Sequence, residues 1–307
     1  MKRLSLILIL LVASASQAHA SADHERPKVG LVLGGGGARG AAHVGVIRVL
    51  EEQNIRVDYV AGTSMGAIVG ALYALGLTAD EIEAELLAVD WGDLFADRTS
   101  RLQRSMRRKE DDTASFIPIE FGLRDFNLSL PRGYIAGQKF PFAFDVPGLV
   151  AVGHRSFDDL PIPFRAVATD LETGDEVVLA GGNLIRAVRA SMSVPGVFPP
   201  VEMDGRLLVD GFLSSDLPVD VVREMGADVV IAVNVERRVD AGDRDRLRTI
   251  DGITDQMFRI RTERAIRTEI DRADVVIRPD VDEWMGHEYD RLARIIPRGE
   301  TAAREVA

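Results

Sequence analysis

The residue whose surroundings most suggest chemistry is a serine between two glycines, in the segment Gly62-Thr63-Ser64-Met65-Gly66. An apolar run precedes this segment and a helical pattern follows it, which is the G-x-S-x-G arrangement that exposes a serine hydroxyl on a sharp turn. Serine is also a common N-cap at the start of a helix. Because glycines stand on both sides of the turn, we predict that Ser64 is a nucleophile.

A serine hydroxyl is a weak nucleophile and needs a neighbouring base. None of the histidines after residue 20 is placed as a base; they are His24, His43, His154 and His287. Asp210 is better placed, because it ends an apolar strand predicted at 206–209 and precedes a glycine. Asp-Gly is also typical of a plain turn. Beside the serine turn, however, the pattern favours Asp210 as the general base at the same edge of the sheet.

A glycine-rich loop, Gly34 to Gly37 followed by Gly40, separates a predicted strand from a predicted helix. Backbone amides at such a turn point outward and attract negative charge. The spacing also fits a dinucleotide fingerprint, but that site needs an acidic residue at the end of the second strand, where this chain has the serine turn. The Gly-Lys-Ser/Thr of a phosphate-binding loop does not follow. The loop is therefore predicted to be the oxyanion hole of a serine acyl hydrolase.

Alternating strand and helix patterns must position these residues. Strands are predicted at 29–33, 57–61, 164–168, 176–179, 206–209, 228–235 and 273–277, and helices at 41–53, 65–75, 79–89, 184–190, 217–225, 250–270 and, in part, 288–306. Thr78 and Glu81 are spaced as a capping box, and Asn183 is a predicted N-cap. The alternation predicts one α/β domain with a mostly parallel sheet and helices on both faces.

The first 20 residues are predicted to be a cleaved signal peptide, because Lys2 and Arg3 precede an apolar run that ends at Ala18-His19-Ala20. Residues 21–27 form a polar leader. The chain lacks cysteine, which excludes disulfides. Its net charge of −11 argues against nucleic acid as a partner. We expect an exported protein, located in the periplasm, on the outer membrane or outside the cell.

Residues 98–153 have a weaker pattern than the rest of the chain. A basic run is followed by apolar residues that glycine and proline interrupt. This segment is predicted to be either an irregular insertion with a solvated charged face or a lid that contacts a membrane.

Four motifs in this order resemble those of the patatin-like phospholipase family: Gly34–Gly40 (GGGGARG), Gly62–Gly66 (GTSMG), Ala190–Pro200 (ASMSVPGVFPP) and Asp210-Gly211. The resemblance implies a three-layer α/β/α sandwich over residues 28–307 and hydrolysis of acyl esters of lipids such as phospholipids. It implies a dyad of Ser64 and Asp210, an oxyanion hole made by the amides of Gly35, Gly36 and Gly37, and Arg39 as a support for that loop. No metal or cofactor is implied. With its predicted signal peptide, the chain resembles the exported bacterial branch of the family.

One residue departs from the family pattern. Phe212 follows Asp210-Gly211, where the family has glycine or alanine, and its bulk is expected to affect the turn that holds the carboxylate. This motivates a second hypothesis, a catalytically weak or inactive module that binds lipid or another partner on the same fold. A third is a soluble esterase that acts on small esters. Peripheral contact with a membrane is compatible with the first two, and the oligomeric state stays open.

Overall fold

The computed structural model describes residues 26–96, 156–238 and 246–307, with short pieces at 122–124, 127–129 and 153–154 and at residues 135, 139 and 244. The predicted signal peptide (1–20) and most of the predicted leader and of the 98–153 insertion lie outside the described residues. All of the elements that carry the predicted site residues are described.

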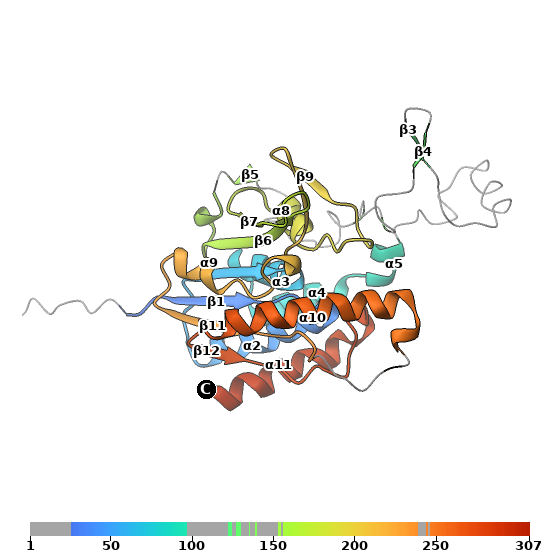
Figure 1. Ribbon diagram of the computed structural model, residues 1–307. Helices are drawn as coiled ribbons and strands as arrows, with labels where there is room; N and C mark the ends of the chain where they lie inside the picture. The colour runs from blue at the N-terminus through green and yellow to red at the C-terminus, as the bar shows by residue number, and fades with distance from the viewer. Residues whose placement is uncertain are drawn as a thin grey trace, which may run out of the picture.

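The main sheet has eight strands in the described part of the chain (Figure 1). Their order is β12 (Val275–Ile277), β11 (Val229–Val233), β1 (Val29–Leu33), β2 (Tyr59–Thr63), β6 (Phe164–Asp170), β10 (Arg206–Asp210) and β9 (Val201–Met203), with β7 (Glu176–Leu179) also paired to β6. Neighbours from β12 to β6 run parallel, whereas β10, β9 and β7 pair antiparallel. The predicted mostly parallel sheet is confirmed.

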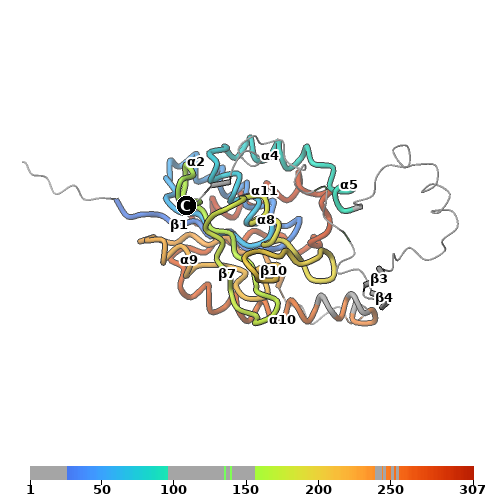
Figure 2. The backbone as a smooth tube through the Cα atoms, turned by 90° about the horizontal axis from the view of Figure 1, so that it is seen from above, coloured from blue at the N-terminus to red at the C-terminus, as the bar shows by residue number. Residues whose placement is uncertain are grey.

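Helices cover both faces of this sheet (Figure 2). One face packs against α2 (Ala42–Glu52), α3 (Met65–Ala74), α4 (Ala79–Ala88), α8 (Leu184–Ser191) and α11 (Leu292–Val306), and the other against α9 (Val219–Glu224) and α10 (Ile250–Ile270). Residues along β1 alternate between the two cores, since Leu31 and Leu33 belong to the first and Val32 to the second. The chain is therefore the predicted α/β/α sandwich.

Sequence patterns over a few neighbouring residues predicted most of the helices and strands. Helix α10 spans the predicted residues, Asn183 caps α8 through its side chain, and Thr78 and Glu81 form the predicted capping box at the start of α4. Strand β7 returns antiparallel to β6, as the hairpin pattern indicated. Helix α5 (Trp91–Ala96) and the short strands β8 (Gly182–Asn183) and β9 were not predicted.

Two predicted boundaries are wrong because residues distant in the sequence determine them. Strand β2 extends to Thr63, two residues past its predicted end, because β6 pairs with it up to that residue. Helix α9 begins at Val219 and not at Leu217, because the Leu217 amide donates a hydrogen bond to the Glu269 carboxylate at 3.1 Å. The first correction matters for the site, since the strand leads directly into Ser64.

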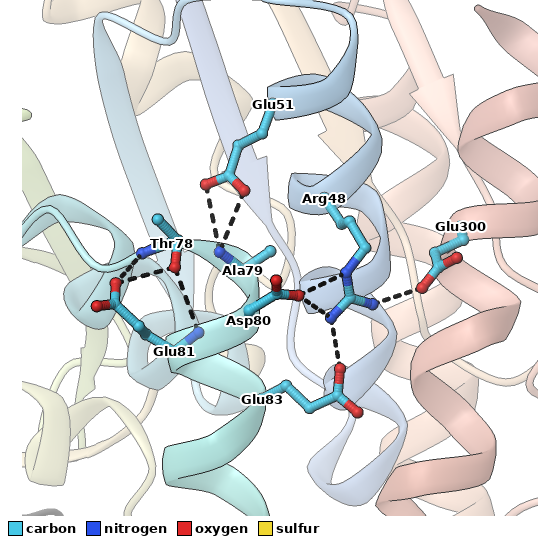
Figure 3. Close-up of polar contacts among 8 residues, drawn as sticks. All are labelled: Arg48, Glu51, Thr78, Ala79, Asp80, Glu81, Glu83 and Glu300. Carbon is cyan, nitrogen blue, oxygen red and sulfur yellow. Dashed lines mark hydrogen bonds and ion pairs between the residues drawn. The ribbon is translucent and has the colours of Figure 1, made fainter.

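Helices α2, α4 and α11 are joined by one guanidinium (Figure 3). Arg48 of α2 pairs with Asp80 at 2.9 Å and Glu83 at 2.5 Å on α4, and with Glu300 of α11 at 2.5 Å. Arg48, Glu83 and Glu300 are 20%, 30% and 27% exposed, so solvent screens their two pairs less than it screens an isolated surface pair. Asp80 is 87% exposed, so its pair is screened like one at the surface. The network links the three helices on this face of the sheet.

Arg48→Ala is expected to lower the free energy of unfolding by about 1–2 kcal/mol, because it leaves three carboxylates close together without their cation. Denaturant unfolding measures the loss, which should shrink as salt is added. Arg267→Ala is the matched control, since Arg267 makes an exposed pair with Glu263 on one helix and should cost less than about 0.5 kcal/mol. Equal losses in the two variants would show that the Arg48 network contributes no more than a surface pair.

Candidate active site

Ser64 lies on a sharp turn between β2 and α3. Its backbone has φ 54° and ψ −120°, a conformation that is strained for a residue with a side chain. A Cβ at Gly66 would lie 2.0 Å from the Leu33 carbonyl oxygen, so only glycine allows the turn to pass this close to β1. The Ser64 side chain makes no capping hydrogen bond to α3, which removes the N-cap interpretation. Its hydroxyl is therefore not used to cap the helix.

A second serine holds this turn in place. The Ser64 amide donates a hydrogen bond to the Ser191 hydroxyl at 3.0 Å, and that hydroxyl donates to the Val167 carbonyl at 2.5 Å. Ser191 is fully buried at the end of α8. Ser191 lies in the motif Ala190–Pro200, but the sequence assigned it no role. Its place in that motif was the only signal for it.

The structure brings Asp210 to Ser64 at one edge of the sheet. Strand β10 runs antiparallel to β6, although the sheet is mostly parallel. The register still works, because Thr63 pairs with Val167 and the next residue of β6, Ala168, pairs with Asp210. Since β6 lies between the two strands, Asp210 and Ser64 lie at the same level of the sheet.

Burial sets the chemistry of the Asp210 carboxyl. Asp210 is fully buried, and this desolvation raises its pKa to about 7. The Phe212 amide donates to Asp210 Oδ1 at 3.1 Å, and this hydrogen bond and the Ser64 hydroxyl both act to lower that pKa. Asp210 Oδ2 makes no hydrogen bond within the described residues. A carboxyl with this pKa takes up and releases a proton near neutral pH.

Phe212 does not displace the carboxylate. Its backbone amide holds Asp210, while its ring points toward α10 and packs edge to face against Phe258, with ring centroids 5.3 Å apart. The side chain that departs from the family pattern therefore forms a wall of the site. The ring is accommodated beside α10.

The glycine loop is supported from behind by two side chains. Arg39 donates from Nε to the Val235 carbonyl at 3.1 Å and pairs with Glu236 at 2.8 Å, which fixes the loop to the end of β11. The Nε2 of His43 lies 2.8 Å from the Gly34 carbonyl oxygen. Complete burial lowers the pKa of His43 to about 4, so this histidine is neutral and holds the loop, consistent with a packing role.

The three predicted oxyanion-hole amides differ in their surroundings. The Gly35 amide faces the buried Asp216 carboxyl and acts to lower its pKa, which desolvation and neighbouring carboxylates raise well above the ordinary value. The Gly36 and Gly37 amides donate no hydrogen bond in the described part of the chain. These two amides are therefore available to an incoming oxygen, whereas the Gly35 amide already has a partner.

Ser64, Asp210 and the glycine loop open into one cavity of about 550 Å³. Much of its wall is apolar, including Ile68, Phe198 and Phe258. An aromatic cluster continues this wall, with Tyr289 stacked on Trp91 at 4.4 Å between ring centroids. Arg39, Arg237 and Arg259 line it as well. A cavity with both apolar and cationic walls suits an amphiphilic ligand.

Neither a metal cluster nor a membrane span is found in the described ranges. No group of three or more His, Asp or Glu side chains there is placed to hold a metal ion. No helix there is long and apolar enough to cross a bilayer.

The α/β/α fold with a serine on a strand-to-helix turn beside a buried carboxyl is typical of α/β serine hydrolases. A family model of the patatin-like phospholipases matches residues 31–223, and the chain belongs to that family of lipid acyl hydrolases. It is 38% identical over 210 residues to an NTE family protein of Mycobacterium tuberculosis, covering 68% of this chain and 49% of the relative. It is also 38% identical over 212 residues to patatin-like phospholipase domain-containing protein 7 of Rattus norvegicus, covering 68% and 14%.

The chain thus spans about half the length, or less, of these relatives. Among solved structures, it is similar to VipD from Legionella pneumophila, with a TM-score of 0.45 and 15% identity, covering 91% of this chain and 66% of that one. It is similar to the type III effector ExoU with a TM-score of 0.39 and 16% identity, covering 91% and 52%.

Proposed function

We propose that the protein is a serine lipid acyl hydrolase that cleaves ester bonds of phospholipids with a dyad of Ser64 and Asp210. The observation that carries the proposal is the contact between a hydroxyl on a strained turn and a buried carboxyl with a pKa of about 7. A base with that pKa is suited to accept a proton near neutral pH. Family membership supports lipid esters as the substrate class.

In the proposed reaction, the Asp210 carboxylate takes the proton of Ser64 while the serine oxygen bonds to the ester carbonyl carbon. The amides of the glycine loop stabilise the resulting oxyanion. The Gly36 and Gly37 amides are favoured for this role because they have no acceptor among the described residues. The alcohol then leaves with the proton from Asp210, and water attacks the acyl-enzyme by the same proton transfers.

Arg39 is proposed to act through the loop, by holding it against Val235 and Glu236. In this role it orients the amides and does not touch the substrate. The bound position of the loop, with Ala38 donating to the Gly286 carbonyl at 2.8 Å, supports a hole that exists before the substrate arrives.

Labelling with a serine-directed phosphonate tests the nucleophile. We expect one adduct per chain, located on the Ser64 peptide by mass spectrometry, with hydrolysis of phosphatidylcholine vesicles lost in proportion to labelling. Ser64→Ala should abolish both the adduct and turnover, whereas Ser214→Ala, a nearby hydroxyl that does not line the cavity, should keep both. Vesicle hydrolysis that survives in Ser64→Ala would refute the dyad.

A further inference from the structure

One buried arginine in the cavity makes no ion pair with the residues that the structure describes. Arg259 of α10 is 9% exposed and lines the same cavity as Ser64. Its guanidinium donates to the Gln256 side-chain oxygen at 3.3 Å and to the Arg238 carbonyl, and both of these acceptors are neutral. Its Nε is buried and makes no hydrogen bond, and no ion pair of Arg259 occurs among the described residues. A buried cation of this kind is unfavourable unless an anion joins it.

Arg39, another buried arginine of the cavity, does make an ion pair. Arg39 lines the cavity and is also buried, but it pairs with Glu236 at 2.8 Å and uses its Nε on the Val235 carbonyl. The Glu236 charge is therefore compensated by Arg39. Arg259 instead has a buried Nε without an acceptor and makes no ion pair in the described part of the chain.

The rest of that wall indicates where an anion would lie in a substrate. The α3 and α8 side of the cavity is apolar, with Ile68 and Met192, and can take an acyl chain. Phe258 and Arg259 belong to α10, which covers the opposite face of the sheet from those helices. An ester bound at Ser64 would thus have its acyl chain on one side and Arg259 of α10 on the other.

We propose that Arg259 forms an anion subsite that binds the phosphate group of the ester substrate beside Ser64. Guanidinium suits this task because its planar fork gives paired hydrogen bonds to phosphate oxygens. The inference rests on the proposed function for its substrate. The anion site itself rests only on the geometry of Arg259.

Matched substrates test the subsite. One is a short-chain phosphatidylcholine and the other a diacylglycerol with the same acyl chains, both below their aggregation concentrations. Arg259→Met should lower kcat/KM for the phosphate ester by about 30- to 100-fold, since it removes a charge-assisted contact, and change the neutral ester by less than threefold. Arg259→Lys should recover part of the loss. Arg264→Met, an exposed arginine on the same helix, should change neither substrate by more than twofold.

Equal losses on both substrates would show a structural role for Arg259 and overturn the subsite, as would no loss on either. Calorimetric titration of the Ser64→Ala protein separates this from failure of the proposed function, because binding needs no turnover. We expect glycerophosphocholine or inorganic phosphate to bind to Ser64→Ala and not to Ser64→Ala combined with Arg259→Met. Tighter binding of glycerophosphocholine assigns the site to a lipid headgroup, and tighter binding of phosphate assigns it to the free ion. Failure of both to bind refutes the anion subsite.

Discussion

Asp210→Asn is expected to lower kcat/KM by about 10³- to 10⁴-fold, because an amide cannot accept the Ser64 proton. The change keeps the size of the side chain and the hydrogen bond from the Phe212 amide to its Oδ1, so the turn should persist. Hydrolysis of a soluble ester by the purified variant measures the loss. Asp170→Asn is the control, since Asp170 is buried on the neighbouring strand, accepts a hydrogen bond from the Glu172 amide, and lies outside the cavity wall.

The same carboxyl predicts the pH dependence. With a pKa of about 7, Asp210 is protonated in the folded state at pH 5 and ionised at pH 9. Since the base must be ionised, kcat/KM should rise through about pH 7 and then level off. A wild-type profile that stays flat between pH 5 and pH 9 would contradict Asp210 as the base.

The free energy of unfolding should fall as pH rises, whereas kcat/KM should increase. Between the ordinary value of 3.8 and about 7, the folded chain holds a proton on Asp210 that the unfolded chain has released. The unfolded state therefore binds fewer protons, and this group lowers the free energy of unfolding as pH rises from about 4 to 7. Asp210→Asn removes that penalty, which is up to about 4 kcal/mol for a pKa raised from 3.8 to about 7. The variant should thus gain stability relative to wild type above pH 7 while it loses activity.

Gly299→Ala is expected to lower the free energy of unfolding by about 3 kcal/mol or more, an effect at the upper end for overpacking. Gly299 of α11 lies against α2, and a Cβ there would be 1.8 Å from the Ala42 carbonyl oxygen. On the facing helix, a Cβ at Gly45 would be 2.2 Å from the Ile296 carbonyl oxygen. Both obstacles are backbone atoms, so the two helices would have to separate.

The separation would reach the glycine loop, because α2 begins directly after it. Thermal and denaturant unfolding measure the effect. Gly92→Ala is the matched control within a helix, where the nearest atom to a Cβ is the Asp90 side-chain oxygen at 3.4 Å. It should be neutral or stabilising by up to about 1 kcal/mol, since alanine favours helix over glycine. If Gly299→Ala behaves like Gly92→Ala, the close helix contact does not limit stability.

The sequence by itself determined what depends on neighbouring residues. Helix α10 has its predicted bounds, and the capping box at Thr78 and the cap at Asn183 are confirmed, because each is a contact within a few residues. The turn around Ser64 was predictable for the same reason. The glycines that the turn needs stand beside the serine in the chain.

What only the tertiary structure decided depends on contacts between distant segments. The Ser191 hydroxyl supports Ser64 from 127 residues away, and the register of the antiparallel strand β10 brings Asp210 to its level. The sequence shows that Phe212 departs from the family pattern, but only the fold shows that Phe258 packs against its ring. Arg259 appeared as one charge in a charged helix. Its burial without an ion pair to any described residue became visible only when α10 was placed against the cavity, since the cost of a charge depends on what surrounds it in space.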